Sequence, residues 1–339
     1  MGRRRKIWIA VAGIAALAAG ALWLQGSTAP APVPVSVGTG LPGGVYDAVG
    51  RSLAELADGD VLTITAVPTA ASVENLSRVR SGDLDAGFAL ADVAALAMSK
   101  PDPSEAANGS SGVQELRAVA RLYDNSVHLV VRAASPYDGL EELAGARVSL
   151  GAENSGTEVI AERLLEVAGI SATVEGNPAG AEGNPEGVAA ALRLGLGASV
   201  AALERDEIDA FFWSGGLPTD AITSLASRVP IRLLDVSAAV SDLTASYGAF
   251  YAEAPILADT YPGVAPVRTV SVPSLLVVGS EMPDDVAAAL TRAVLDSREE
   301  LARLHPATYQ LSPRTAVATS PVPLHPGAAR YYREAKPFA

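Results

Sequence analysis

Two stretches of the sequence share one pattern, and this pattern decides the fold. Residues 33–49 read VPVSVGTGLPGGVYDAV, and residues 147–167 read RVSLGAENSGTEVIAERLLEV. In each stretch a short apolar run ends in a glycine-containing loop, and apolar residues then recur at helical spacing. Each half also contains an Asp-Ala-x-Phe sequence after a helical pattern, at residues 85–88 and 209–212. The repeated order of strand, loop, helix and strand predicts two related α/β lobes.

Two apolar segments indicate how the lobes are joined. Residues 127–131 follow a strand-like segment at 116–122, and residues 270–278 follow the second α/β unit. A helical pattern comes next, so the chain enters the second lobe along one strand and returns to the first along another. We expect a hinge of two crossing strands. The predicted first lobe comprises residues 35–126 and 275–339, and the predicted second lobe comprises residues 127–274.

The N-terminus has the pattern of an export signal. Basic residues at 3–6 precede an uninterrupted apolar run at 7–24, close to the roughly 20 residues that span a bilayer. We predict that residues 1–28 form either a signal peptide that is removed or a membrane anchor that is retained. Residues 29–34 are predicted to form a Pro-rich tether, and the rest of the chain is expected outside the cytoplasm.

Composition excludes several kinds of chemistry. The chain has no cysteine, which rules out disulfides, thiol catalysis and lipid attachment through a cysteine. Its formal net charge of −13 opposes binding to nucleic acid. The same charge repels an anionic ligand at long range, so local backbone dipoles would have to hold such a ligand. With 49% hydrophobic but only 5% aromatic residues, the core must consist mainly of Val, Leu, Ile and Ala.

The first glycine loop formally matches a dinucleotide-binding fingerprint, with Gly38, Gly40 and Gly43 between a strand and a helix. However, Pro42 interrupts the loop, and no acidic residue stands at the end of the next strand to bind a ribose. We therefore predict no nucleotide cofactor. Two interpretations remain: the loop is only a tight turn, or its backbone N–H groups and the helix from Val45 bind an anion.

The second loop offers a similar choice. Ser155 and Glu158 have the spacing of a capping box, which explains both residues but not Gly156 and Thr157. A helix start flanked by hydroxyl groups, facing the first glycine loop across a hinge, favours a cradle for a carboxylate. Ser72 likewise either caps a helix or contributes to a binding site.

Few residues suggest catalysis. The histidines at positions 128, 305 and 325 do not have the spacing of metal ligands, and no nucleophile has a local base signature. We predict no enzyme activity, no metal and no cofactor. Trp213 leaves a strand close to two glycines, where it either packs in the core or forms the wall of a ligand cleft.

Taken in order, these motifs resemble those of the TAXI family of solute-binding proteins, the extracytoplasmic subunits of one class of TRAP transporter. The resemblance extends from about residue 35 to residue 332. It rests on the combination of the glycine loop at 38–46, Ser-Val-Glu-Asn-Leu at 72–76, Ala-Asp-Val at 91–93, Val-His-Leu-Val-Val at 127–131, Gly151 with Ser-Gly-Thr-Glu at 155–158, Asp-Ala-Phe-Phe at 209–212 and Pro-Leu-His-Pro-Gly-Ala at 323–328.

The resemblance implies a type II periplasmic-binding-protein fold with crossing hinge strands, in agreement with the architecture predicted above. It also implies a glutamate-like amino acid or a dicarboxylate as ligand, and a membrane permease of a TRAP transporter as partner. By motif match, the implied ligand-binding residues are Thr39, Gly40, Gly43, Tyr46, Ser72, Asn75, Asp92, Ser155, Gly156, Thr157 and Trp213.

The sequence departs from the family pattern in three places. Leu41-Pro42 replaces small residues, Leu90 stands where a Gln is usual, and Glu153-Asn154 replaces a Pro-Gly type turn. Leu90 removes a polar contact and Glu153 adds a negative charge beside the expected anion cradle, and both changes bear on which ligand is bound. We expect a monomer that binds a small carboxylate for transport. The alternative is a ligand-sensing subunit for a membrane signalling partner.

Overall fold

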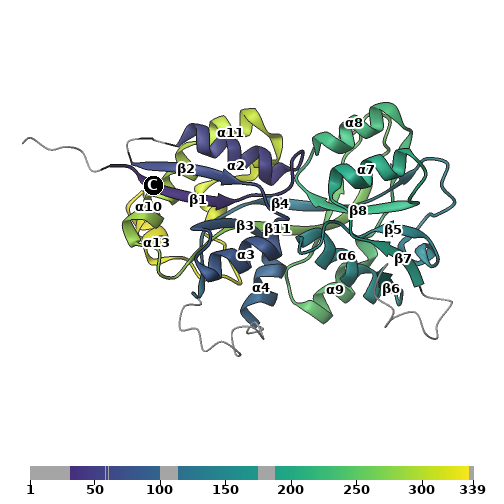
Figure 1. The fold of residues 1–339 in the computed structure, drawn as a ribbon, viewed down its shortest axis with the longest axis horizontal. Helices are drawn as coiled ribbons and strands as arrows, with labels where there is room; N and C mark the ends of the chain where they lie inside the picture. The colour runs from purple at the N-terminus through teal and green to yellow at the C-terminus, as the bar shows by residue number, and fades with distance from the viewer. Residues whose placement is uncertain (1–30, 58, 60, 100–113, 175–187, 336–339) are drawn as a thin grey trace, which may run out of the picture.

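The computed structural model describes residues 31–57, 59, 61–99, 114–174 and 188–335. The chain forms two α/β lobes side by side, and two long strands run through both lobes (Figure 1). The predicted leader at residues 1–28 lies outside the described residues. None of the helices in the described part of the chain is long and apolar enough to cross a lipid bilayer.

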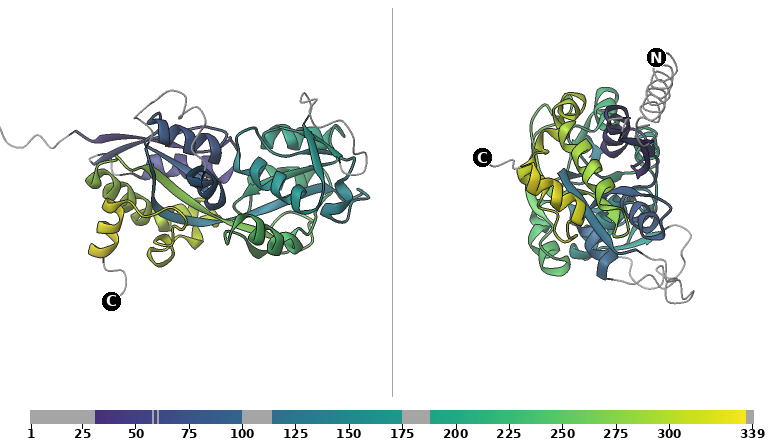
Figure 2. Two further views of the ribbon diagram at one scale, coloured as in Figure 1. Left: turned by 90° about the horizontal axis from the view of Figure 1, so that it is seen from below. Right: turned by 90° about the vertical axis from the view of Figure 1, so that its left-hand side faces the viewer.

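The first lobe combines the N-terminal elements with the C-terminal helices, which pack together although they lie far apart in the sequence (Figure 2). Its N-terminal elements are β1 (Val33–Gly38), α2 (Val45–Leu56), β2 (Leu62–Val67), α3 (Ser72–Ser81), β3 (Ala86–Leu90) and α4 (Ala91–Ser99). Its C-terminal elements are α10 (Asp284–Asp296), α11 (Arg298–Leu304), the 3-10 helix η4 (Pro306–Gln310), α12 (Pro313–Ala316) and α13 (Pro326–Glu334).

The second lobe is formed by the middle of the chain. Its elements are η1 (Leu140–Leu143), β5 (Arg147–Ser149), α6 (Gly156–Val167), β6 (Ser171–Val174), β7 (Val188–Leu192), α7 (Leu196–Glu204), β8 (Ala210–Gly215), α8 (Asp220–Arg228), β9 (Ile231–Leu233), η3 (Ser237–Ala239), α9 (Val240–Tyr247) and β10 (Ala252–Ile256). The strands shared by both lobes are β4 (Leu116–Arg132) and β11 (Val267–Gly279).

One hydrogen-bonded sheet connects the lobes, in the strand order β2-β1-β3-β11-β4-β8-β5-β7-β6. Within each lobe the outer strands are parallel, whereas β4 and β11 run antiparallel to their neighbours. Helices cover both faces: α2 and α11 lie opposite α3 and α4, and α7 and α8 lie opposite α6 and α9 (Figure 1). Strands buried on both faces explain why β3 has no exposed residue.

The crossing strands change partners at the junction of the lobes. Strand β4 pairs with β11 as far as Ser126 and then with β8, while β11 pairs first with β10 and, from Ser274, with β3. Pro273, which has no N–H group, falls where β11 changes partner and where its register with β4 shifts. The predicted hinge of two crossing strands is therefore present, and the fold is a two-lobed periplasmic-binding-protein fold.

One element boundary differs from the prediction. The segments at 116–122 and 127–131 belong to one strand, because the polar residues Asp124 and Asn125 between them still pair with β11. Helix α6 begins at Gly156, where the capping-box spacing predicts it, because Ser155 accepts a hydrogen bond from the N–H of Glu158. The core consists mainly of Val, Leu, Ile and Ala, as the composition predicts.

Candidate functional site

A narrow cavity lies between the lobes, next to the crossing strands. The first lobe and β4 line it with Gly40, Leu41, Gly44, Val45, Tyr46, Ala70, Ala71, Ser72, Leu90 and Asn125, and the second lobe lines it with Ala152, Ser155, Gly156, Thr157, Trp213, Ser214 and Gly215. The space that the centre of a water molecule can reach is about 30 Å3, room for roughly two water molecules. The lobes are therefore nearly closed on each other in this structure.

Several helices begin at the cavity wall. Helix α2 starts at Val45, α3 at Ser72 and α6 at Gly156, and all three residues line the cavity. Helix α4 starts at Ala91, directly after the lining residue Leu90. The first N–H groups of a helix have no partner within the helix, and the helix dipole places partial positive charge there. The wall therefore favours a negatively charged ligand.

The second lobe adds hydroxyl groups to this wall. Ser155 Oγ accepts the N–H of Glu158 at 3.0 Å, and Thr157 Oγ1 accepts the N–H of Ser214 at 3.2 Å. The oxygens of both hydroxyls are thus engaged as acceptors, and their protons remain to be donated to a ligand. Ser155 is both the cap of α6 and part of the cavity wall, so both interpretations of this residue from the sequence apply.

The wall at the crossing strands is a polar cluster around Tyr46. The Tyr46 hydroxyl lies 2.9 Å from Ser274 Oγ, and Asn125 Nδ2 donates to the Tyr46 hydroxyl at 3.2 Å and also to Ser274 Oγ. Burial raises the pKa of Tyr46 well above its usual value, so this hydroxyl stays neutral and keeps its proton. The cluster fixes the Tyr46 side chain of α2 against both β4 and β11.

Ser72 does not cap α3. The N-cap residue is Ala71, which has φ of 85°, a conformation that residues other than glycine rarely adopt. Ser72 Oγ instead accepts the N–H of Leu90 at 3.1 Å, and so ties the start of α3 to the end of β3. Both Ala71 and Ser72 line the cavity.

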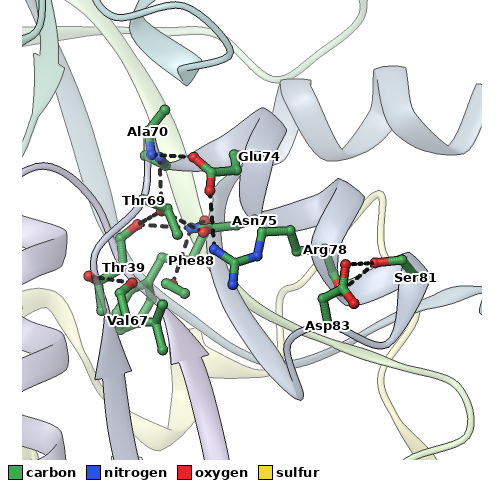
Figure 3. A network of polar contacts seen from close by, with 12 residues as sticks. Thr39, Val67, Thr69, Ala70, Glu74, Asn75, Arg78, Ser81, Asp83 and Phe88 are labelled. Carbon is green, nitrogen blue, oxygen red and sulfur yellow. Dashed lines mark hydrogen bonds and ion pairs between the residues drawn. The ribbon is translucent and has the colours of Figure 1, made fainter.

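Seven of the eleven sequence-predicted residues line the cavity: Gly40, Tyr46, Ser72, Ser155, Gly156, Thr157 and Trp213. Asn75 and Thr39 lie behind its wall, because both are fully buried and bonded to the main chain. Asn75 Nδ2 donates to the carbonyls of Gly38, Thr39 and Phe88 at 3.1, 2.8 and 2.8 Å, as Figure 3 shows for part of the network. These two residues hold the glycine loop in place from the side that faces away from the cavity.

Gly43 and Asp92 also lie outside the cavity lining. Gly43 has φ of 84°, which permits the tight turn of the glycine loop. Asp92 is buried at the start of α4, where its carboxylate accepts hydrogen bonds from Arg163 at 2.7 Å and from Tyr251 at 3.0 Å. Both partners belong to the second lobe, so Asp92 holds the lobes together.

Further contacts close the lobes around the cavity. The N–H of Glu74 donates to the carbonyl of Asn154 across the cleft at 3.2 Å. Gly156 approaches the first lobe so closely that an added Cβ would lie 2.6 Å from Ser72 Oγ and 2.7 Å from Leu90 Cδ1. Only glycine allows this approach without displacing those side chains.

Two polar lining residues were not selected from the sequence. Asn125 follows Asp124 between the apolar segments at 116–122 and 127–131, and this polar break is the signal that could have identified it. Ser214 belongs to the Trp-Ser-Gly-Gly sequence at 213–216, and its buried Oγ has no hydrogen-bond partner among the described residues. Of the family departures, Leu90 lines the cavity, whereas Glu153 is mostly exposed beside Arg193.

The histidines lie in structural positions. His128 Nε2 is 2.8 Å from the Tyr261 hydroxyl, and burial lowers the pKa of His128 to about 4. His305 and His325 each precede a proline, and their Nδ1 atoms accept a main-chain N–H two residues later. Within the described residues no group of three or more histidine, aspartate or glutamate side chains is placed to hold a metal ion.

Solved structures with similar chains share little sequence identity with this one. XAC2383 from Xanthomonas citri bound to ATP is 17% identical with a TM-score of 0.48, and the match covers 89% of this chain and 94% of that chain. PhnD1 from Prochlorococcus marinus in complex with methylphosphonate is 13% identical with a TM-score of 0.48, over 82% and 91% of the two chains. The periplasmic aliphatic sulphonate binding protein SsuA from Escherichia coli is 14% identical with a TM-score of 0.42, over 89% and 79%.

A family model also matches most of the chain. The profile described as the NMT1-like family matches residues 37–335, which include both lobes and every residue of the cavity wall. The chain therefore belongs to the NMT1-like family.

Proposed function

We propose that this chain is an extracytoplasmic solute-binding protein of the TAXI type, which captures a small carboxylate between its lobes and delivers it to a TRAP-type permease. The observation that carries the proposal is the convergence of the starts of α2, α3 and α6 on one cavity between the lobes. The proposed ligand-contacting residues are Gly40, Tyr46, Ser72, Asn125, Ser155, Gly156, Thr157, Trp213 and Ser214.

Each lobe supplies only part of this wall. Helices α2 and α3 belong to the first lobe and α6 to the second, so a ligand that contacts all three favours the closed arrangement. We place the division of the lobes at residues 126/127 and 274/275, next to the change of strand partners at Ser126 and Ser274. Binding is proposed to occur without turnover.

Thermal unfolding of the purified full-length protein tests ligand capture. The panel contains glutamate, glutamine, 2-oxoglutarate and small mono- and dicarboxylates. A ligand present at 100 times its dissociation constant stabilises the fold by about 2.7 kcal/mol. A saturable shift, with the ligand recovered unchanged by NMR, is the expected result. The absence of a shift with every carboxylate would overturn the proposed function.

The proposed partner and location need a separate measurement. The proposal places the protein outside the cytoplasm as a monomer, either free or held by its N-terminal segment. Uptake of labelled ligand by cells that contain the chain and a TRAP permease should be lost when the chain is deleted. Retained uptake, together with ligand-dependent activation of a membrane signalling protein, would favour the sensing alternative.

A further inference from the structure

The cavity wall carries no ionised side chain. Among the described lining residues there is no Asp, Glu, Lys, Arg or His, and the titratable Tyr46 stays neutral because burial raises its pKa. The carboxylates of Asp92 and Glu74, which lie next to this wall, are paired with Arg163 and Arg78, so their charges are compensated. The electrostatic character of the wall therefore comes from helix starts, which are partially positive.

The hydrogen-bonding groups of the wall are mostly donors. The hydroxyl oxygens of Ser72, Ser155 and Thr157 each accept a main-chain N–H, so each of these groups has a proton to donate. Trp213 Nε1 already donates to Thr219 Oγ1 at 3.0 Å and competes for no acceptor in the cavity. These donors and the helix starts favour a ligand that presents acceptors and negative charge.

We propose that the ligand is a small carboxylate with an oxygen at carbon 2, a 2-oxo or 2-hydroxy acid, and not an amino acid. This inference rests on the proposed function and names the ligand class of the same site. The α-ammonium group of an amino acid brings three donors and a positive charge. It would face the helix starts with no carboxylate in the wall to pair with it, an arrangement that costs free energy on burial.

Ser214 supplies a second observation, which calls for a polar atom at carbon 2. Its Oγ is buried at the cavity and has no hydrogen-bond partner among the described residues, which is rare for a buried polar atom. The N–H of the same residue is bonded to Thr157, which fixes the position of the main chain there. A polar atom at carbon 2 of the ligand satisfies the Ser214 hydroxyl while the carboxylate is held at the helix starts. Because the wall offers no carboxylate to pair with an ammonium group, that atom is an oxygen.

Calorimetric titration of the full-length protein with matched ligands tests the inference. Each of two sets contains a 2-oxo acid, a 2-hydroxy acid, an amino acid and an acid unsubstituted at carbon 2. The first set is pyruvate, lactate, alanine and propionate, and the second is 2-oxoglutarate, 2-hydroxyglutarate, glutamate and glutarate. In whichever set binds, the acids with oxygen at carbon 2 should bind at least tenfold more tightly than the amino acid. They should also bind more tightly than the acid unsubstituted at carbon 2.

A serine variant adds a test of the contact. Ser214→Ala should lower the affinity for the oxygen-bearing acid about tenfold and leave that for the unsubstituted acid unchanged. Ser224→Ala, at an exposed serine of α8, is the matched control and should change neither. An amino acid that binds as tightly as its oxygen-bearing counterpart would overturn this inference and leave the proposed function intact. Equal loss of affinity for both acids in Ser214→Ala would likewise overturn this inference and leave the proposed function intact. Failure of every carboxylate to bind would overturn both.

Discussion

Arg163 Nη1 of the second lobe lies 2.7 Å from Asp92 Oδ2 of the first, and this ion pair joins the lobes behind the cavity. The side chains are 10% and 0% exposed. Tyr251 donates to the same carboxylate oxygen, and the Tyr247 ring lies 4.6 Å from the guanidinium carbon of Arg163. Burial raises the pKa of Asp92, while Arg163 and Tyr251 lower it. The carboxylate has these partners only while the lobes are closed.

Replacing Arg163 should therefore open the cleft. Arg163→Met leaves the Asp92 carboxylate buried without its cation, an arrangement that costs about 3–5 kcal/mol, and the lobes can relieve it by separating. We expect a larger radius of gyration in small-angle X-ray scattering without ligand. Arg147→Met, which breaks an ion pair with Asp209 inside the second lobe, is the control and should leave the radius unchanged. An unchanged radius for both variants would contradict the prediction.

Gly156→Ala should hold the lobes apart. The new methyl group would lie 2.6 Å from Ser72 Oγ and 2.7 Å from Leu90 Cδ1 on the opposite lobe. Overpacking of this kind costs about 1–3 kcal/mol, so ligand affinity should fall by a corresponding factor. Gly197→Ala in α7, where a Cβ meets no atom within 4 Å, is the matched control and should retain full affinity. Equal affinity of the two variants in a calorimetric titration would exclude the steric effect.

Thr157→Val keeps the shape of the side chain and removes its hydroxyl. We expect binding to weaken by about 1–3 kcal/mol, because a hydrogen bond to a charged ligand is lost. Unfolding without ligand should change little, since only one hydrogen bond to Ser214 N–H disappears. Thr223→Val, whose hydroxyl donates to the Thr219 carbonyl within α8, serves as the control. If Thr157→Val bound the ligand normally, Thr157 would not belong to the site.

Asn75→Ala should lower the stability of the fold, because Asn75 supports the glycine loop and does not contact the ligand. The substitution removes the donor shared by the carbonyls of Gly38, Thr39 and Phe88, of which Thr39 still accepts the hydroxyl of Thr69. A buried group left unpaired costs about 1–3 kcal/mol, so urea unfolding of the ligand-free protein should show a loss of about 2 kcal/mol. A variant with normal stability but poor affinity would instead place Asn75 in contact with the ligand.

The buried His128 should make the fold sensitive to acid. Its pKa in the folded protein is about 4, below the ordinary value of 6.5, because burial disfavours the charged ring. The stabilising contribution is complete above pH 6.5 and is lost as the pH falls toward 4, amounting to about 3 kcal/mol. His128→Gln should remove this part of the pH dependence when unfolding is measured at a series of pH values. If the free energy of unfolding of the variant fell with pH as steeply as that of the wild type, other groups would cause the acid sensitivity.

Local patterns in the sequence were sufficient to predict the main elements. The apolar spacing that begins at Val45 predicts α2, because the buried residues Val49 and Leu53 recur on one face of that helix. The repeated Asp-Ala-x-Phe sequence predicts β3 and β8, which occupy corresponding places beside the crossing strands. The motifs also identified seven residues of the cavity wall, several of them at helix starts, since helix starts lie at the ends of parallel strands.

Relationships between distant parts of the chain were not predictable in this way. Asp92 and Arg163 are 71 residues apart and meet only because the lobes pack together. Asn75 was identified by its motif, but its role depends on a side-chain direction that the motif does not specify. Asn125 contributes to the cavity through its position in β4, which is set by the register of that strand against β11.

Trp213 gives the molecule a built-in optical reporter. The sequence contains three tryptophans, of which Trp8 and Trp23 fall in the predicted N-terminal leader. If the leader is removed, all indole emission from the mature protein comes from one ring in the cleft, where it touches Gly44 of the opposite lobe. Opening and closing of the lobes would then change the exposure of this one indole ring to water, so that its fluorescence reports lobe motion in real time without any label.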